Sequence, residues 1–325
     1  MKADTAEVSR GPTALRAALK PFAVLQPLAV PIAFIALAGL AALAGPRLPP
    51  SLAGLKLIGP YVMLVAAAGV TLWFNRGRAF VMALALLAAY AGYVEIVAYG
   101  PGAVAAHATL LAIAVLVPLN VFASLALPER GAGLSTTWPW ILLIVLQAVL
   151  VAWFAASPAA AAPVEDWRAL FGHWALRSQP VPLLGRLAFA AAFGAAVWRC
   201  WPRFGPLESG KAGALVAFYI ACSFSENSVV FAAFMSAAGA TLLAAALQES
   251  YRLAFHDELT GLPGRRALDE RMRALGAKYA IAMVDVDHFK KFNDTHGHDI
   301  GDQVLKLVAA RLAEVGAGGR AYRYG

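Results

Sequence analysis

The sequence predicts a polytopic α-helical membrane domain followed by a small α/β domain that is incomplete at its C-terminus. Of its 325 residues, 60% are hydrophobic and only 14% are charged, a composition too apolar for a soluble protein of this size. Between residues 22 and 247 the apolar residues gather in long runs. Residues 257–325 lack such runs and instead show shorter helical and strand patterns.

Six apolar runs approach the roughly 20 residues that a helix needs to cross a bilayer. A longer stretch, Ala212–Leu247, is interrupted by the polar tip Ser225-Glu226-Asn227-Ser228. It can be one long helix with a polar patch or two helices, and two helices bring the expected number of spans to about eight. The six separate runs are Phe22–Ala44, Leu57–Phe74, Phe80–Tyr99, Val104–Leu127, Trp140–Ala156 and Val181–Trp198.

The basic residues predict the orientation of these spans. With residues 1–21 in the cytoplasm, ten positive side chains fall in cytoplasmic segments and four in the opposite ones. Such an excess marks the cytoplasmic side, and an even number of spans then leaves the C-terminal domain in the cytoplasm. Because the positive residues lie mostly between the apolar runs, membrane topology explains the net charge of +8, and no nucleic-acid partner is expected. The ten are Lys2, Arg10, Arg16, Lys20, Arg76, Arg78, Arg130, Arg199, Arg203 and Lys211; the four are Arg47, Lys56, Arg168 and Arg177.

Five polar residues lie within the predicted spans: Glu95, His107, Asn120, Arg186 and Glu226. Such groups are costly in a membrane unless they are paired or face a polar cavity. They are candidates for a sensed-ligand site in residues 22–247. Arg186 and Glu226 lie near the ends of their spans. Alternatively, therefore, their long side chains extend to the membrane surface and bind no ligand.

Residues 248–256 are expected to form a helical connector, because Tyr251 and Phe255 are four residues apart. In the following domain, Pro263 is expected in the first turn of a helix that ends at Gly276. A strand is predicted over Tyr279–Val286, then a second helix with Asp299 as its N-cap. A final strand is expected to begin in residues 320–325. This order of elements is typical of an α/β domain.

Asp285 and Asp287 follow the apolar run at 279–284. A buried strand that ends in two acids delivers carboxylates to the edge of a sheet. Carboxylates there suit Mg²⁺, which proteins hold by one or two acids together with substrate phosphates. Lys290 follows closely enough to act as a counter-charge for a phosphate.

This stretch resembles the first half of a GGDEF domain, the nucleotidyl-cyclase-like catalytic domain of diguanylate cyclases. Four motifs in register carry the resemblance: Asp257-x-Leu259-Thr260-x-Leu262-x-x-Arg265, Asp285-x-Asp287-x-Phe289-Lys290, Asn293-Asp294, and Gly297-His298-Asp299-x-Gly301-Asp302. The sequence ends at Tyr324-Gly325, where the signature Gly-Gly-(Asp/Glu)-Glu-Phe of the family would begin.

The resemblance implies a catalytic metal ion, Mg²⁺ or Mn²⁺, bound by the Asp285 carboxylate and the Val286 carbonyl. The second metal-binding acid of the family lies in the signature motif. Asn293 and Asp302 match the pair that recognises guanine. The resemblance also implies phosphate binding by Lys290 and by the backbone amides of His288 and Phe289. His298 is counted among the expected substrate-binding residues, and Arg323 also lies in a family position; neither is assigned a more specific role. Asp257 and Arg265 are expected to be structural.

The expected function is that of a membrane sensor diguanylate cyclase, in the plasma (inner) membrane of a bacterium, with membrane lipid around its spans. Its complete form would condense two GTP into cyclic di-GMP and pyrophosphate as a homodimer of GGDEF domains. A chain without the signature motif should be inactive alone. One alternative is a non-catalytic membrane receptor with a degenerate GTP-binding domain, and another is a transporter whose tail regulates it.

Overall fold

The computed structural model describes residues 26–44, 53–99, 104–128, 131–156, 181–201, 205–316 and 318–325. The chain divides into two compact units, Met1–Gln248 and Glu249–Gly325, each of which is described by itself. The predicted cytoplasmic segment 1–21 lies outside the described residues, as do residues 22–25 of the first predicted span.

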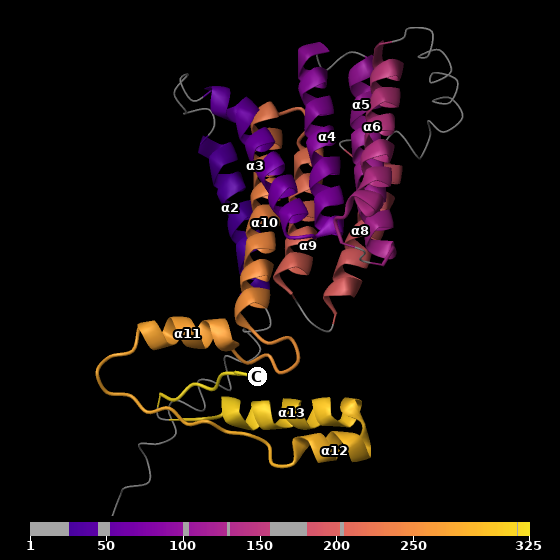
Figure 1. The fold of residues 1–325 in the computed structure, drawn as a ribbon. Coiled ribbons are helices and arrows are strands. Elements are labelled where there is room, and N and C mark those ends of the chain that lie inside the picture. Colours follow the sequence, from indigo (N-terminus) through magenta and orange to yellow (C-terminus); the bar gives the residue numbers. More distant parts are fainter. Residues whose placement is uncertain are drawn as a thin grey trace, which may run out of the picture. The chain divides into compact units, whose positions relative to one another are not determined.

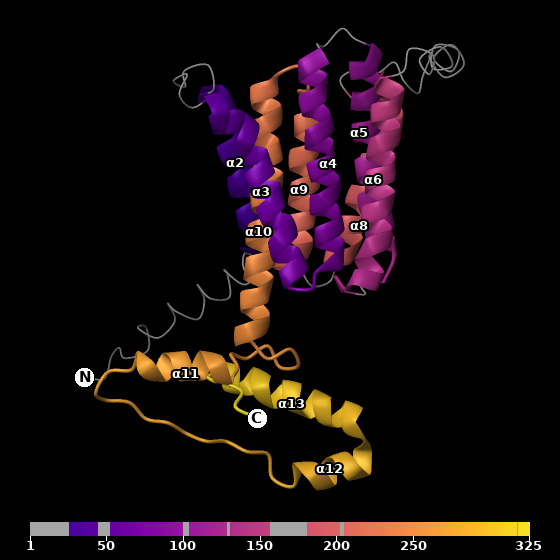
Figure 2. The same ribbon diagram turned by 45° about the horizontal axis from the view of Figure 1, so that its top comes forward.

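The first unit is a bundle of helices that run side by side (Figures 1 and 2). Helix α4 contacts α3, α5 and α6, and α8 contacts α5 and α9. The helices are α2 (Ala29–Ala44, after the short 3₁₀ turn η1, Gln26–Leu28), α3 (Ala53–Trp73), α4 (Gly77–Tyr99), α5 (Val104–Ala126), α6 (Leu134–Ala156), α8 (Leu183–Cys200), α9 (Pro206–Ser223) and α10 (Ser228–Phe255).

Six of these described helices are long and apolar enough to cross a membrane: α2 with η1, α4, α5, α6, α8 and α10. The apolar part of α3, Leu57–Trp73, is shorter, and α9 carries Glu208 and Lys211 in its first turns. The expected break in the apolar stretch 212–247 is confirmed, because α9 ends at Ser223 and α10 begins at Ser228.

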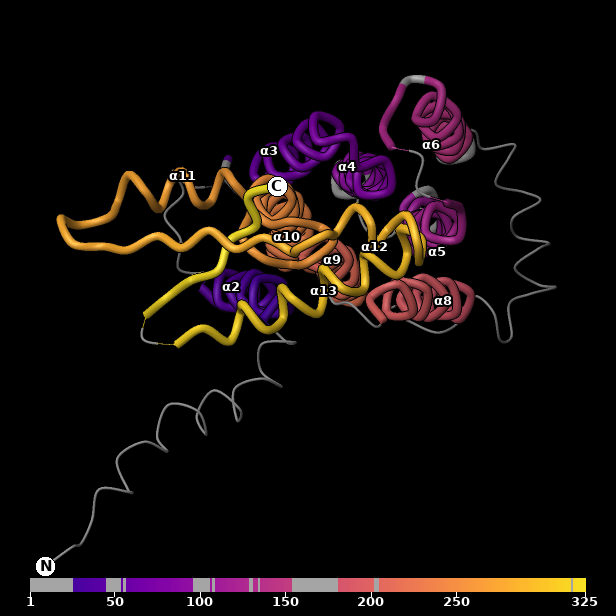
Figure 3. The backbone as a smooth tube through the Cα atoms, turned by 60° about the horizontal axis from the view of Figure 1, so that its bottom comes forward, coloured from indigo at the N-terminus to yellow at the C-terminus, as the bar shows by residue number. Residues whose placement is uncertain are grey.

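Helix α9 lies inside the bundle, with α2, α10 and α8 around it (Figure 3). Most of its residues are buried, including Ser209 and Lys211. The Lys211 ammonium lies 2.6 Å from Glu208 Oε1 one turn away, so the charge of the buried cation is compensated. Helices α2 and α6 instead expose many apolar side chains, among them Leu40 and Val149, as expected of helices that face lipid.

Small residues allow α10 and α9 to approach their neighbours closely. A Cβ added at Gly239 of α10 would lie 2.9 Å from the backbone carbonyl carbon of Met63 in α3. Likewise, a Cβ added at Gly210 of α9 would overlap Ala245 of α10. Such close approach is the usual source of van der Waals contact between membrane helices.

The Tyr93 ring of α4 also stacks on Phe231 of α10, with ring centroids 3.6 Å apart.

The described residues of the second unit form three further helices: α11 (Arg265–Arg273), α12 (Phe289–His296) and α13 (His298–Ala313). Helices α12 and α13 contact each other. The helical connector is confirmed, since residues 249–255 form the last turns of α10. The Tyr251 and Phe255 rings stack with centroids 4.4 Å apart.

The α/β pattern predicted for this unit is not found in the described residues. Residues 279–286 and 320–325 form no strand, and the one described bridge pairs His256 with Pro263. A β-strand is stabilised by hydrogen bonds to a neighbouring strand. No described segment pairs with residues 279–286, so these residues do not form one. Met283 and Val284 accordingly remain 79% and 63% exposed.

Two predicted helix starts were also wrong. Helix α11 begins at Arg265 with Gly264 as its N-cap, because Pro263 is held in the bridge to His256. Helix α13 begins at His298 after Gly297, so Asp299 lies in its first turn and is not the N-cap. Gly297 has φ = 85°, a left-handed conformation that glycine adopts readily.

Candidate functional site

Asp285 lies in the extended segment before α12, and its carboxylate is exposed to solvent. Its Oδ1 accepts a hydrogen bond from the Val286 amide at 2.9 Å. The Val286 carbonyl, the second predicted metal ligand, accepts from the Phe289 amide at 3.3 Å. Both oxygens are hard metal ligands on adjacent residues. Each accepts one hydrogen bond and keeps a lone pair that could bind a metal ion.

The turn into α12 is formed by His288, which has φ = 56° and is the N-cap of the helix. Its carbonyl accepts a hydrogen bond from the Phe292 amide at 3.0 Å. The Phe289 amide, predicted to bind phosphate, is engaged by the Val286 carbonyl instead. Lys290 is exposed in the first turn of α12.

The structure places Asn293 of α12 against Gly301 of α13, the residue before Asp302. A Cβ added at Gly301 would overlap the Asn293 side-chain oxygen, so a larger residue at position 301 would displace the Asn293 side chain. The Asn293 Oδ1 atom is buried and has no hydrogen-bond partner. Asp302 and His298 are exposed on α13. The two residues predicted to recognise guanine therefore lie on two helices in contact.

Asp257 is structural, as expected. Its Oδ1 accepts hydrogen bonds from the Thr260 amide at 2.8 Å and the Thr260 hydroxyl at 2.6 Å. It also lies 2.7 Å from a guanidinium nitrogen of Arg323. Partial burial raises the pKa of Asp257, but the hydrogen bonds from Thr260 and Arg323 outweigh this effect and leave the pKa below its ordinary value.

The aromatic partner of Arg265 was not predicted from the sequence. Its guanidinium lies over the ring of Tyr324, 4.8 Å from the centroid, a cation–π distance. Residues 323–324 are thus connected at two points to the loop and helix at 257–265. No local pattern indicates such a contact, because its members lie far apart in the sequence.

Among the described residues, no group of three or more His, Cys, Asp or Glu side chains is arranged to hold a metal ion. Asp285 and Val286 alone would supply two oxygen ligands. This set fits Mg²⁺ or Mn²⁺ only where substrate oxygens and water complete the coordination, the usual arrangement for Mg²⁺.

The sequence model of the family described as "Diguanylate cyclase, GGDEF domain" matches residues 254–325. Residues 254–325 belong to the GGDEF domain family. These residues are named the GGDEF segment below. The family match covers all four motifs that carried the resemblance.

Relatives of the GGDEF segment occur in several bacteria. The diguanylate cyclase VdcA of Vibrio cholerae is 45% identical over 76 residues, which make up 22% of this chain and 22% of that protein. The response regulator PleD of Caulobacter vibrioides is 45% identical over 74 residues, 21% of this chain and 16% of that protein. The cyclic di-GMP phosphodiesterase NbdA of Pseudomonas aeruginosa is 42% identical over 71 residues, 20% of this chain and 9% of that protein.

The chain therefore spans about a fifth of the length of VdcA and less of the other two. No solved structure matches the chain. The similarity lies in the GGDEF segment and connects it with proteins of cyclic di-GMP metabolism.

The polar residues that were predicted to lie within the spans have different surroundings in the structure. The Asn120 amide of α5 donates to Gln147 Oε1 of α6 at 2.7 Å, and the Gln147 amide donates back to Asn120 Oδ1 at 3.2 Å. Asn120 is thus paired with Gln147, a partner that was not predicted from the sequence. Glu95 and Glu226 are exposed, and Arg186 lines a shallow pocket with Phe189 and Tyr219. The His107 side chain lies outside the described residues.

Proposed function

We propose that this protein is a membrane-embedded signalling protein whose GGDEF segment takes part in condensing two GTP into cyclic di-GMP and pyrophosphate. The observation that carries the proposal is the family match over residues 254–325, the range that contains Asp285, Asn293 and Asp302. The names of relatives such as VdcA support the same chemistry.

The membrane location is supported by the six long apolar helices in the first unit. The positive residues are concentrated in alternate segments between the spans, which favours a cytoplasmic N-terminus and a cytoplasmic GGDEF segment. GTP is available in the cytoplasm. In this proposal the first unit lies in the plasma (inner) membrane of a bacterium, in contact with lipid, and acts as the sensor.

In the proposed site, the Asp285 carboxylate and the Val286 carbonyl would hold Mg²⁺ or Mn²⁺ next to the nucleotide phosphates. The bound ion would stabilise developing negative charge and lower the pKa of the attacking hydroxyl. Lys290 would provide a positive charge to the phosphates from the start of α12. The His288 amide would donate a hydrogen bond to a phosphate oxygen. The Phe289 amide would contribute less, because it already donates to the Val286 carbonyl.

Guanine would be read by Asn293 and Asp302. The Asn293 amide can form hydrogen bonds with the base, and the Asp302 carboxylate can accept from ring and amino N–H groups. His298, exposed at the start of α13, lies beside this pair in sequence and is included in the proposed nucleotide contacts.

Cyclisation requires two GTP molecules, one held by each of two GGDEF domains. The 3′-oxygen of each GTP forms a bond to the α-phosphorus of the other, the bond from that phosphorus to the β-phosphate oxygen breaks, and pyrophosphate leaves. The hydroxyl proton is released to solvent. Two such transfers close the ring, so the active form in this proposal is a homodimer.

The test compares GTP binding with GTP turnover in membranes that contain the full-length gene product. We expect pyrophosphate release that requires Mg²⁺ or Mn²⁺, and a loss of at least a hundredfold on Asp285→Asn with GTP binding reduced much less. The matched control is Asp269→Asn, the same change at an exposed acid of α11, which should keep full activity. GTP binding without any pyrophosphate release would instead support a non-catalytic GTP receptor.

A further inference from the structure

The shallow pocket that Arg186 lines is a groove of about 300 Å³ between α8 and α9, two helices that contact each other. Its volume is at the lower end of the range for small-molecule sites, roughly 300–1,000 Å³. The residues from α8 form one stripe, spaced as i, i+3, i+4 and i+7: Arg186, Phe189, Ala190 and Phe193. The residues from α9 are Leu215, Val216 and Tyr219. This space is named the α8–α9 groove below.

The α8–α9 groove has a polar end and an apolar end. The Phe189 ring lies edge-on to the Tyr219 ring, with centroids 5.1 Å apart, so these two residues lie at the same level. Arg186 is one turn from Phe189 toward the start of α8, and Tyr219 is one turn before the end of α9. Consecutive helices with a short connection run antiparallel. Arg186 and Tyr219 therefore form the polar end, and Phe193 and Leu215 form the apolar end.

Packed side chains form the floor of the groove. Phe189 and Leu215 are 6% and 1% exposed, and the Phe189 ring also lies 5.4 Å from the Phe218 ring. The rim is open, because Phe193 and Tyr219 are 42% and 37% exposed. The groove is thus part of the packed bundle and is open on one side.

Arg186 brings an uncompensated positive charge to the polar end. Its side chain is exposed, and none of the described residues forms a hydrogen bond or an ion pair with its guanidinium. The described residues that line the groove include no acid. A cation within a membrane span is costly unless it is paired, and an anion from outside the chain would provide the pairing.

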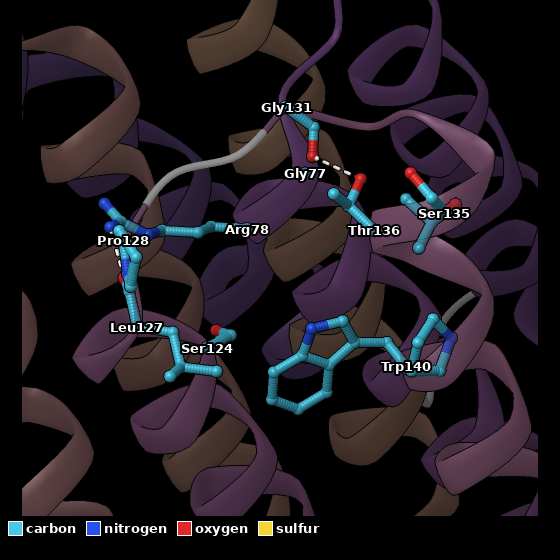
Figure 4. Close-up of a pocket in the computed structure, with 11 residues that line it drawn as sticks. Gly77, Arg78, Ser124, Leu127, Pro128, Gly131, Ser135, Thr136 and Trp140 are labelled. Atoms are coloured by element: carbon cyan, nitrogen blue, oxygen red, sulfur yellow. Dashed lines mark hydrogen bonds between the residues drawn. The ribbon is translucent and has the colours of Figure 1, made fainter.

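Arg78 of α4 shows the opposite arrangement, a cation that the chain itself engages. It lines a cavity of about 260 Å³ where α4 and α6 begin and α5 ends (Figure 4). Its guanidinium is directed at Leu127 and Pro128 and donates to the Leu127 carbonyl. Arg199 of α8 likewise donates to the Leu125 carbonyl at 2.6 Å. Of these three described arginines, Arg186 is the one without such an acceptor.

A ligand that suits both ends of the groove is an amphiphile with an anionic head and a single apolar chain. A guanidinium pairs with a carboxylate through two parallel hydrogen bonds, and the apolar end would contact the chain. The volume suits one chain, whereas a phospholipid carries two. Arg186 is the fourth residue of α8, about 5 Å along the helix axis from its start. The head would therefore lie near the membrane surface and the chain nearer the middle, as amphiphiles lie in a bilayer.

We propose that the α8–α9 groove binds a fatty acid, with its carboxylate paired to Arg186 and its chain against Phe193 and Leu215. The distribution of positive residues favours a position for the start of α8 on the side opposite the cytoplasm. The groove would then be the site at which the sensor unit takes up its ligand from the outer leaflet. This inference rests on the membrane location in the proposed function and does not depend on GTP turnover.

The test uses the full-length gene product in nanodiscs of phosphatidylcholine and a dodecanoic acid with a photoreactive diazirine in its chain. At about pH 8.5, well above the ordinary pKa of a carboxylic acid, the probe is ionised. Mass spectrometry of the digested protein locates the label, which we expect within residues 189–193 and 215–219. Unlabelled dodecanoate should compete at least about tenfold more effectively than dodecanol, which has the same chain and no charge, as one charge-assisted contact provides.

Four variants test the two ends of the groove separately. Arg186→Gln should abolish the preference for dodecanoate over dodecanol, and Arg186→Lys, which keeps the charge, should retain part of it. Ala190→Trp fills the groove and should nearly abolish labelling, so the proposal stays testable if Arg186→Gln does not fold. Ala191→Trp is the matched control, the same change at an exposed neighbour outside the described lining, and it should leave labelling unchanged.

Equal competition by dodecanoate and dodecanol, or an equal loss of labelling in Ala190→Trp and Ala191→Trp, would overturn the proposal. Competition by dioctanoyl phosphatidylglycerol as effective as that by dodecanoate would overturn the fatty-acid assignment and identify an anionic phospholipid as the occupant. Absence of labelling in the wild type, together with a lower melting temperature of Arg186→Gln, would mean that Arg186 is paired within the chain. GTP turnover in the same nanodiscs distinguishes failure of this proposal from failure of the proposed function, because labelling does not require turnover.

Discussion

Asp257 and Arg323 are joined by an ion pair of 2.7 Å, although 66 residues separate them in the sequence. The Arg323 amide also donates to the Pro263 carbonyl at 2.8 Å. The end of the GGDEF segment is thereby connected to the turn that follows α10. This turn is further closed by the Gly264 amide, which donates to the Phe255 carbonyl at 2.7 Å.

Replacing Asp257 by Ala should loosen this turn. The carboxylate accepts hydrogen bonds from Thr260 and Arg323 and is only partly exposed, so its loss should cost about 1–3 kcal/mol of local stability. Hydrogen–deuterium exchange of peptides covering residues 255–264 measures the change. Arg311→Gln is the control, because the Arg311–Glu314 pair is 76% and 69% exposed and should contribute little. Equal protection in Asp257→Ala and the wild type would contradict this account.

The same turn should depend on pH. Because the pKa of folded Asp257 lies below its ordinary value of 3.8, the folded state favours the charged carboxylate. Its contribution to stability is therefore fully present above about pH 4 and is lost as the pH falls through the folded pKa. Exchange protection of residues 255–264, corrected for intrinsic rates, should decline over that acid range in the wild type. The Asp257→Asn variant should show no such decline, and a parallel decline would assign the effect to another group.

The Asn120–Gln147 pair should stabilise the contact between α5 and α6. Asn120→Leu would leave the Gln147 amide without its partner and should cost about 1 kcal/mol. The double variant Asn120→Leu, Gln147→Leu removes both polar groups and should recover most of this loss. Thermal unfolding of the detergent-solubilised protein gives the comparison. Additive losses in the double variant would mean that the two amides do not interact.

Gly239 should tolerate no larger side chain. An alanine Cβ there would lie 2.9 Å from the Met63 backbone, so Gly239→Ala should push α10 from α3 and lower the unfolding free energy by about 1–3 kcal/mol. Gly194 of α8 has no atom within 4 Å of an added Cβ, and Gly194→Ala should be neutral or stabilising because alanine favours the helix. Equal melting temperatures for the two variants would refute the close contact.

The sequence predicted the helices of the first unit well because an apolar run of membrane length is a strong local signal. The start of α9 was missed: the predicted apolar stretch began at Ala212, whereas the helix begins at Pro206. The two charged residues in its first turns, Glu208 and Lys211, pair with each other and are accommodated inside the bundle. A pair at i and i+3 can be recognised in a sequence, but its burial depends on the neighbouring helices.

The residues proposed for the site were predicted from the sequence, whereas their geometry was not. The motif positions from Asp285 to Asp302 were identified by their resemblance to a family, and the family match supports that assignment. The packing of Asn293 on Gly301 and the Asp257–Arg323 pair depend on the tertiary fold, which spacing along one chain does not encode. The strand predicted at 279–286 rested on local pattern, whereas strand formation requires a paired neighbour.

The most direct test of the proposed function is the formation of cyclic di-GMP from GTP by membranes that contain the full-length gene product, quantified by mass spectrometry. The account predicts cyclic di-GMP in the wild type and in Asp269→Asn, and at least a hundredfold less in Asp285→Asn at equal protein level. Absence of cyclic di-GMP from the wild type at saturating GTP and Mg²⁺, or undiminished synthesis by Asp285→Asn, would contradict it.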